Sequence, residues 1–288
     1  MTTALRRDAR GGFPLFRVAG IQIRVDPSWF LIFLLIWWSL GAGYFPRTQP
    51  EAGALQSWAA GLLAALLFFV SLLIHELSHS LVARRAGQEV RTITLFLFGG
   101  AAEMTSEPED PATEFRIAAV GPLASFVLAA LFALTARSLP DATPELLVGV
   151  VRYLGWVNLA LGVFNLLPGF PLDGGRMLRA VLWWRTGSLR RASRVATEAG
   201  KGLGLGLAIL GGLQIFAGAL VGGIWLVLIG LFARGLAESS YQSLILRQLL
   251  GQVAVEDVMV RDPVCVPPDL TLARLVDEYV LGHGFRGF

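Results

Sequence analysis

Long apolar runs, separated by short polar loops, dominate this sequence. A helix needs about 20 apolar residues to cross the hydrocarbon core of a membrane, and six runs approach or exceed that length. They lie at roughly residues 28–45, 57–83, 114–137, 146–167, 202–218 and 219–236. The pattern predicts a polytopic α-helical membrane protein with about six transmembrane helices, of which the last two are the least clearly separated.

Two short stretches have the pattern of strands instead. Residues 13–25 partly alternate apolar and polar positions, as a half-exposed strand does, and the Asp-Pro pair at 26–27 ends that strand and begins a helix. Residues 92–98 are rich in β-branched and aromatic side chains and precede two glycines. Non-helical backbone at membrane depth is tolerated only against protein or a watery cavity. We therefore expect a small membrane-associated β-sheet or hairpin.

Composition agrees with a membrane protein. The chain has 288 residues, of which 55% are hydrophobic and 16% charged, whereas soluble domains are about 25% charged. The single cysteine, Cys265, excludes an internal disulfide framework. No nucleic-acid module is recognisable, so we expect the lipid bilayer rather than nucleic acid as a partner.

The basic residues indicate how the chain is oriented. Arginines gather in the N-terminal tail and in the segments after the second and fourth spans, whereas the opposite loops carry at least as much acid as base. Basic loops stay in the cytoplasm, so we expect a multi-pass protein of the cell (plasma) membrane with both termini cytoplasmic. The expected divisions are a cytoplasmic tail and strand at 1–27, a transmembrane domain at 28–240, and a linker with a soluble α/β tail at 241–288.

The second span contains the sequence HELSH, which places His75, Glu76 and His79 in an apolar helix. Positions i and i+4 share a helix face, so both imidazoles can reach one metal ion, while the glutamate can address a water molecule beside it. This spacing is typical of zinc hydrolases. The alternative is a metal-free, hydrogen-bonded polar cluster, although ionisable groups at membrane depth are usually functional.

A catalytic zinc ion needs a third protein ligand and an open position. His283, the remaining histidine, lies in the soluble tail, which makes it a poor candidate. Asp173 is the better candidate, because it follows the fourth span at the depth of the histidine pair and nearby prolines and glycines break the helix. The alternative for Asp173 is an Asp-Gly turn with a solvated carboxylate. We expect one Zn²⁺ per chain.

Three segments together resemble the site-2 protease family of intramembrane zinc metalloproteases. They are HELSH, LFLFGGAAEM after the second span, and NLLPGFPLDGGR after the fourth, and the resemblance covers roughly residues 13–240. It implies that His75, His79 and Asp173 bind zinc and that Glu76 is the general base and proton shuttle. It also implies that Asn165 positions the scissile carbonyl or stabilises its oxyanion; packing against another helix is the alternative for this residue.

The tail segment VEDVMVRDPVCVPPDLTLARLV resembles the first part of a CBS domain. The resemblance implies a partial CBS-like module within 241–288. Because such repeats work as pairs, a nucleotide would be expected only at a complete pair.

The resemblance implies that the chain hydrolyses peptide bonds within or near transmembrane segments of membrane-anchored regulators. A transmembrane helix hides its peptide bonds in its own hydrogen bonds and must unwind before attack. The strand at 92–98 could pair with the unwound segment or could merely plug the site. The expected substrate-binding residues are Thr94, Leu95, Phe96, Leu97, Phe98, Gly99 and Gly100.

Other interpretations remain open. The principal alternative function is a catalytically idle zinc-binding scaffold or sensor, against which Glu76 argues. The glycines at 202, 204 and 206 follow no strand, so we expect close helix packing or a flexible gate there rather than a nucleotide loop. The sequence leaves open whether the chain forms a homo-oligomer.

Overall fold

The computed structural model describes residues 12–97, 99–104 and 108–250, and beyond these 254, 256, 259, 265–267 and 269–282. The chain divides into two compact units, Met1–Tyr241 and Gln242–Phe288. The second unit holds the end of α8, the short helix α10 (Leu272–Arg274) and a π-helical turn at Leu275–Leu281. In the remainder of the predicted CBS-like tail, residues 254, 256, 259, 265–267, 269–271 and 282 are described, and His283 lies outside the described residues.

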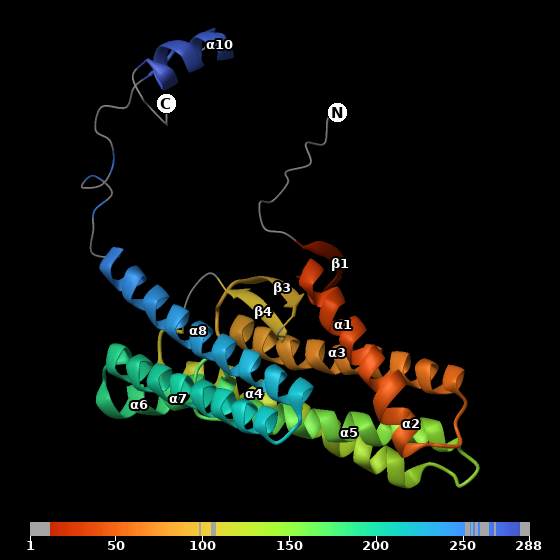
Figure 1. The fold of residues 1–288 in the computed structure, drawn as a ribbon. Coiled ribbons are helices and arrows are strands. Elements are labelled where there is room, and N and C mark those ends of the chain that lie inside the picture. The colour runs from red at the N-terminus through yellow and green to blue at the C-terminus, as the bar shows by residue number, and fades with distance from the viewer. Residues whose placement is uncertain are drawn as a thin grey trace. The chain divides into compact units, whose positions relative to one another are not determined.

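Among the described residues, six helical segments are long and apolar enough to cross a membrane, as predicted. Figure 1 shows α3, α4 and α5 running alongside one another, with α7 and α8 at one end of this bundle. The helices are α1 (Pro27–Ser39), α2 (Phe45–Thr48), α3 (Ala54–Arg85), α4 (Pro111–Ser138), α5 (Glu145–Asn165), α6 (Asp173–Thr186), α7 (Leu189–Phe216) and α8 (Leu220–Leu250). A π-helical turn at Leu40–Tyr44 joins α1 to α2, and these three elements form the first span.

The fifth span differs from its predicted bounds. The apolar run predicts a helix from about residue 202, but α7 already begins at Leu189, where the side chain of Ser188 accepts a hydrogen bond from the amide of Arg191. The first turns of α7 carry arginines together with the buried Ala192 and Ala196. This amphipathic half is polar on average, so a hydropathy pattern hides its helical start.

The predicted strand at 13–25 is in fact two strands. β1 (Phe13–Val18) and β2 (Ile21–Val25) form an antiparallel hairpin. Between them Ala19 has φ 50° and Gly20 has φ 79°. Two consecutive residues with positive φ form the tight turn that matches the twist of paired strands. The reversal needs only these two residues, and the alternation of residues 13–25 does not reveal it.

The sheet has the order β1-β2-β3-β4, with β3 (Val90–Phe96) parallel to β2 and antiparallel to β4 (Gly99–Met104). One face is apolar: Ile21 and Ile23 of β2 and Ile93 of β3 are buried against Ala83 of α3 and Ile117 of α4. The sheet is therefore fixed to the end of α3 that carries the HELSH sequence.

The sheet order bears on one of the two roles considered for the strand at 92–98. Pairing with a substrate would need a free edge, but β3 is paired on both edges. A strand near the middle of a chain acquires partners from distant segments, and β2 lies about 70 residues earlier in the sequence. The terminal strand of the sheet on this side is β4.

Two close contacts fix the helices around the site. Glu114 of α4 is fully buried and forms an ion pair with Arg179 of α6, whose Nε donates a hydrogen bond of 2.6 Å. On α7, a Cβ at Gly204 would lie 2.5 Å from the carbonyl oxygen of Gly230 on α8, so the two backbones meet here. The sequence suggested close helix packing or a flexible gate for the glycines at 202, 204 and 206. At Gly204 the structure shows close packing.

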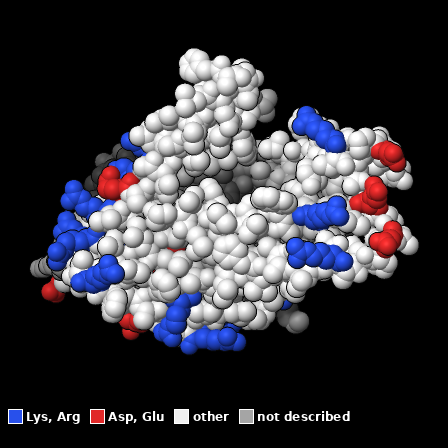
Figure 2. Space-filling view, turned by 90° about the horizontal axis from the view of Figure 1, so that it is seen from below, with Lys and Arg blue, Asp and Glu red and all other residues white. Residues whose placement is uncertain are grey.

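Figure 2 shows a consequence of this arrangement at the surface. On the face it displays, charged side chains gather towards two ends, and the belt between them is almost free of charge. An uncharged belt suits contact with the hydrocarbon core of a bilayer.

Candidate metal centre and active site

His75 and His79 lie one turn apart on the same face of α3, near its C-terminal end. Their side chains are almost completely buried, with 2% and 4% of the residue surface exposed. Their Nε2 atoms are 3.2 Å apart and point to a common position. The i, i+4 spacing of the sequence therefore produces the convergence expected on a helix.

Asp173 reaches the same position from another part of the chain. After α5 ends, the loop at 166–172 folds back, and Gly175 packs so closely on the backbone of Gly169 that a Cβ would collide with it. Asp173 is the first residue of α6 and only 9% exposed. Its Oδ2 lies 3.1 Å from His75 Nε2 and 3.2 Å from His79 Nε2. The carboxylate is thus neither solvated nor part of a simple Asp-Gly turn.

The three side chains form what we call the metal cluster (His75, His79 and Asp173), whose donor atoms all lie within 4.8 Å of one another. Zinc bonds of about 2.0–2.1 Å at tetrahedral angles separate neighbouring donor atoms by about 3.3 Å. The observed separations of 3.1 to 3.2 Å agree with that value. Two imidazoles and one carboxylate leave a fourth position open, as catalytic zinc requires. The donor set fits zinc.

The second nitrogen of each imidazole is also held. His79 Nδ1 lies 2.6 Å from the carbonyl oxygen of Ile117, to which it can only donate, so in a neutral ring Nε2 keeps its lone pair for a metal. His75 Nδ1 lies 2.9 Å from Oγ of the fully buried Ser125. Both partners are on α4, which therefore orients both rings.

Gly121 brings α4 close enough for these contacts. A Cβ at this position would collide with Nε2 of His79 and would lie 2.8 Å from Nε2 of His75. Gly121 and Ser125 were not among the site residues expected from the sequence. The available signal was GPLAS, a glycine, a proline and a serine inside an otherwise apolar span.

Glu76 faces a cavity of about 790 Å³ that also contains the metal cluster. Its walls come from α3, the sheet, α5 and the loop after it, α6, α7 and α8. Gly202 and Gly206 are among the lining residues. β4 passes directly over the glutamate, since a Cβ on Gly100 would lie 2.5 Å from Glu76 Cγ. The carboxylate is thus beside the cluster in a largely apolar space between membrane-spanning helices.

Asn165 lines the same cavity from the last residue of α5. Its Nδ2 donates a hydrogen bond of 3.0 Å to the carbonyl oxygen of Leu161 in the same helix, rather than to another helix. Because an amide nitrogen has two hydrogens, one N–H remains available for a ligand in the cavity.

The expected substrate strand is only partly at the cavity. Phe96, Gly99 and Gly100 line it, whereas Thr94, Leu95 and Leu97 do not, and Phe98 lies outside the described residues. The sheet therefore meets the site at the turn from β3 to β4.

Comparison with known proteins identifies the family. The model of peptidase family M50 matches residues 63–143 and 140–207, which include the whole metal cluster. Rip3 of Mycobacterium tuberculosis is 42% identical over 275 residues, which are 95% of this chain and 70% of Rip3. The chain belongs to peptidase family M50, the site-2 protease family.

Further similar proteins agree with this assignment. The Synechocystis protein sll0528, which like Rip3 is named as a zinc metalloprotease, is 37% identical over 91% of this chain and 68% of its own length. Among solved structures, the site-2 protease from Methanocaldococcus jannaschii aligns with a TM-score of 0.56 at 28% identity, covering 89% of this chain and 100% of that chain.

Family and donor set lead to the same chemistry. The chain is a multi-pass membrane zinc metalloprotease of the site-2 protease type with one Zn²⁺ site. This follows from the M50 match, from the similarity to proteins named as zinc metalloproteases and from the geometry of the metal cluster.

Proposed function

We propose that this metalloprotease cleaves peptide bonds within or near the transmembrane segments of membrane-anchored proteins, as in regulated intramembrane proteolysis. The observation that carries the proposal is the position of the cavity. It holds Glu76 and the metal cluster, and its walls come from the membrane-spanning helices α3, α5, α7 and α8. A site enclosed in this way suits a substrate that arrives through the bilayer.

The proposed roles follow from the contacts of each residue. His75, His79 and Asp173 would hold zinc, which when bound supplies Lewis-acid activation of water and of the substrate carbonyl. Glu76 accepts a proton from the attacking water and delivers it to the leaving amine. The free N–H of Asn165 donates to the substrate carbonyl oxygen and stabilises negative charge that develops there.

The β4 strand is the proposed docking element for an unwound substrate. β4 is the terminal strand of the sheet, and its residues Gly99 and Gly100 line the cavity beside Glu76. A terminal strand presents backbone N–H and C=O groups that an extended peptide can pair with. Pairing there would hold the scissile backbone extended next to the glutamate.

Location and domain roles complete the proposal. The distribution of arginines supports cytoplasmic termini in a plasma-membrane protein. In that orientation the metal cluster would lie towards the cytoplasmic end of α3. Residues 28–240 would carry the protease, after the tail and hairpin at 1–27, and 241–288 a linker and a partial CBS-like module.

The proposal is tested by reconstituting the purified protein in liposomes with zinc and a model single-span substrate. Mass spectrometry should place the cut inside or beside the span, and a Gly-Gly pair in the span should accelerate cleavage by easing unwinding. A matched substrate with Leu-Leu at that site is the control. Absence of any cut by the wild-type protein in the presence of zinc, or cuts confined to a distant soluble domain, would overturn the proposal.

A further inference from the structure

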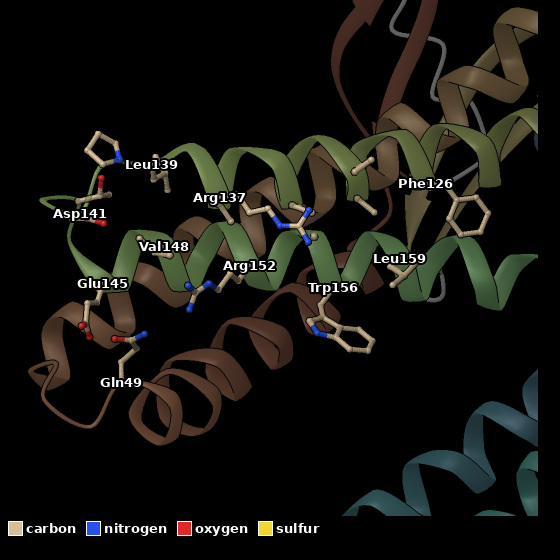
Figure 3. Close-up of a pocket in the computed structure, with 17 residues that line it drawn as sticks. Gln49, Phe126, Arg137, Leu139, Asp141, Glu145, Val148, Arg152, Trp156 and Leu159 are labelled. Carbon is tan, nitrogen blue, oxygen red and sulfur yellow. The ribbon is translucent and has the colours of Figure 1, made fainter.

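A second cavity, of about 1160 Å³, lies between α4 and α5 at the ends of these helices that are farther from the metal cluster (Figure 3). Its walls contain small residues, among them Ala129 and Ala133 of α4 and Gly155 of α5. Small side chains on both helices leave an open apolar groove along their surface. We call this the outer groove.

Charged side chains occur in the outer groove in a definite order. Figure 3 shows Asp141 and Glu145 at its outer end, Arg137 and Arg152 farther in, and the exposed Trp156 beyond them. In the part of the chain that the structure describes, neither arginine forms an ion pair or a hydrogen bond with a protein group. From outside to inside, the groove thus presents carboxylates, guanidinium groups and apolar surface.

The position of Arg152 makes this order informative. Arg152 lies about 10 Å along α5 from Glu145, at about 1.5 Å per residue, inside a helix that spans the membrane. An arginine at such a depth is costly unless it has a partner. Since the described chain offers none, an anionic group from outside the chain is the natural partner.

The length of the groove indicates what brings that anion. From Glu145 to Leu159, both of which line the groove, α5 advances about 21 Å. Half of a bilayer, with its headgroups, is about 20–22 Å thick. The groove is therefore as long as one leaflet and lies along helices that span the membrane.

We propose that the outer groove binds one phospholipid with a primary-amine headgroup, of the phosphatidylethanolamine type. Its phosphate pairs with Arg137 and Arg152, its ammonium group lies towards Asp141 and Glu145, and an acyl chain follows the small residues of the groove. The order of charges along this lipid matches the order in the groove. Phosphatidylglycerol would place a neutral glycerol instead of an ammonium group beside the two carboxylates. The quaternary ammonium of phosphatidylcholine has no N–H to donate to them.

The test uses the intact, detergent-purified protein, equilibrated with equal amounts of phosphatidylethanolamine, phosphatidylglycerol and phosphatidylcholine. Native mass spectrometry should find phosphatidylethanolamine retained preferentially. The double variant Arg137→Gln/Arg152→Gln should retain at least about tenfold less, because two charge-assisted hydrogen-bonding groups are lost. Arg47→Gln, an exposed arginine of α2 outside the groove, should leave retention unchanged. An unchanged melting temperature verifies that each variant is folded.

Two further arms identify the source of the phosphate and the role of the carboxylates. Asp141→Asn/Glu145→Gln should shift the preference from phosphatidylethanolamine towards phosphatidylglycerol. Free phosphoethanolamine should fail to displace the lipid, since it lacks the acyl chains. The proposal would be overturned if the wild type retained all three lipids equally. It would also be overturned if the double arginine variant retained phosphatidylethanolamine as well as the wild type does. Displacement by phosphoethanolamine or by an acidic peptide at concentrations comparable to the lipid would overturn it too.

Discussion

The two ends of the α4–α5 pair treat ionisable groups in opposite ways. At the end near the sheet, the metal cluster is buried and each ring nitrogen of its two imidazoles lies within hydrogen-bond distance of a protein group. At the other end, Arg137 and Arg152 are exposed and have no protein partner among the described residues. We infer from this difference that the metal cluster is organised for a ligand held inside the protein. The two arginines are organised for a ligand that arrives from the bilayer.

The comparison leads to an expectation about mutations. Changes at the metal cluster, at the α4 residues behind it and at Asn165 in the same cavity should alter zinc content, catalysis or both. Chemically matched changes far from the cavity should alter neither. Four variant pairs test this separation, in order of decreasing expected effect.

Asp173→Ala should have the largest effect. It removes one of three donors and leaves two imidazoles with no carboxylate, so bound zinc should fall from about one per chain to near zero and cleavage should disappear. The measurement is metal content after gel filtration, together with cleavage of the model substrate. Glu51→Gln, an exposed acid outside both cavities, should keep zinc and activity. If Asp173→Ala retained one zinc per chain, the aspartate would not be a metal ligand and the contrast between the two ends would be wrong.

Gly121→Ala tests whether the approach of α4 matters. The added methyl group would collide with His79 Nε2, so the ring must move and zinc should be bound substantially more weakly. Gly212→Ala, where a Cβ meets nothing within 4 Å, is the matched control. Equal zinc affinities of the two variants, measured by competition with a chelator, would show that α4 does not constrain the rings.

Asn165→Ala separates catalysis from metal binding. Loss of a donor to the developing oxyanion typically lowers kcat by about 10²- to 10³-fold. Zinc content and KM should change little, because the hydrogen bond that Asn165 forms among the described residues goes to Leu161 of its own helix and not to the metal cluster. The exposed amide residue Gln214 provides the control variant Gln214→Ala. A fall in stability without a fall in kcat would instead assign Asn165 a packing role.

Ser125→Ala should have the smallest effect of the four. Loss of a hydrogen-bond partner behind a metal-binding histidine typically weakens metal affinity by about 10- to 100-fold. At saturating zinc the cleavage rate should recover most of its wild-type value. Ser138→Ala, at the other end of α4, is the control. A defect in Ser125→Ala that persists at saturating zinc would mean that the serine acts on the reaction itself.

Several features of the fold and of the metal cluster could be predicted from the sequence. Span number follows from apolar length, and the convergence of His75 and His79 follows from spacing within one helix. The proline and glycine residues around Asp173 indicated a break that turns a carboxylate back to the histidines. The apolar lengths, the histidine spacing and the break near Asp173 are local features, whereas the contact between Asp173 and His75 joins residues 98 positions apart. The structure shows the corresponding helices and contacts.

The features that were missed depend on which elements pack together. Gly121 and Ser125 become significant only when α4 lies against α3, and β3 loses its free edge only when β2 joins it. The reversal at Ala19 requires two residues of positive φ, of which one is alanine. The outer groove has no motif, because its ordering of charges arises from two different helices and the loop between them.

The central claim is that Glu76 makes the zinc site hydrolytic without holding the metal. Glu76→Gln tests it most directly, because the amide keeps the size of the side chain but cannot accept and pass on the proton. Zinc content and cleavage should be measured on the same reconstituted sample. We predict about one zinc per chain, as in the wild type, and no detectable cleavage. Cleavage at the wild-type rate, or a loss of zinc in proportion to the loss of activity, would contradict the claim.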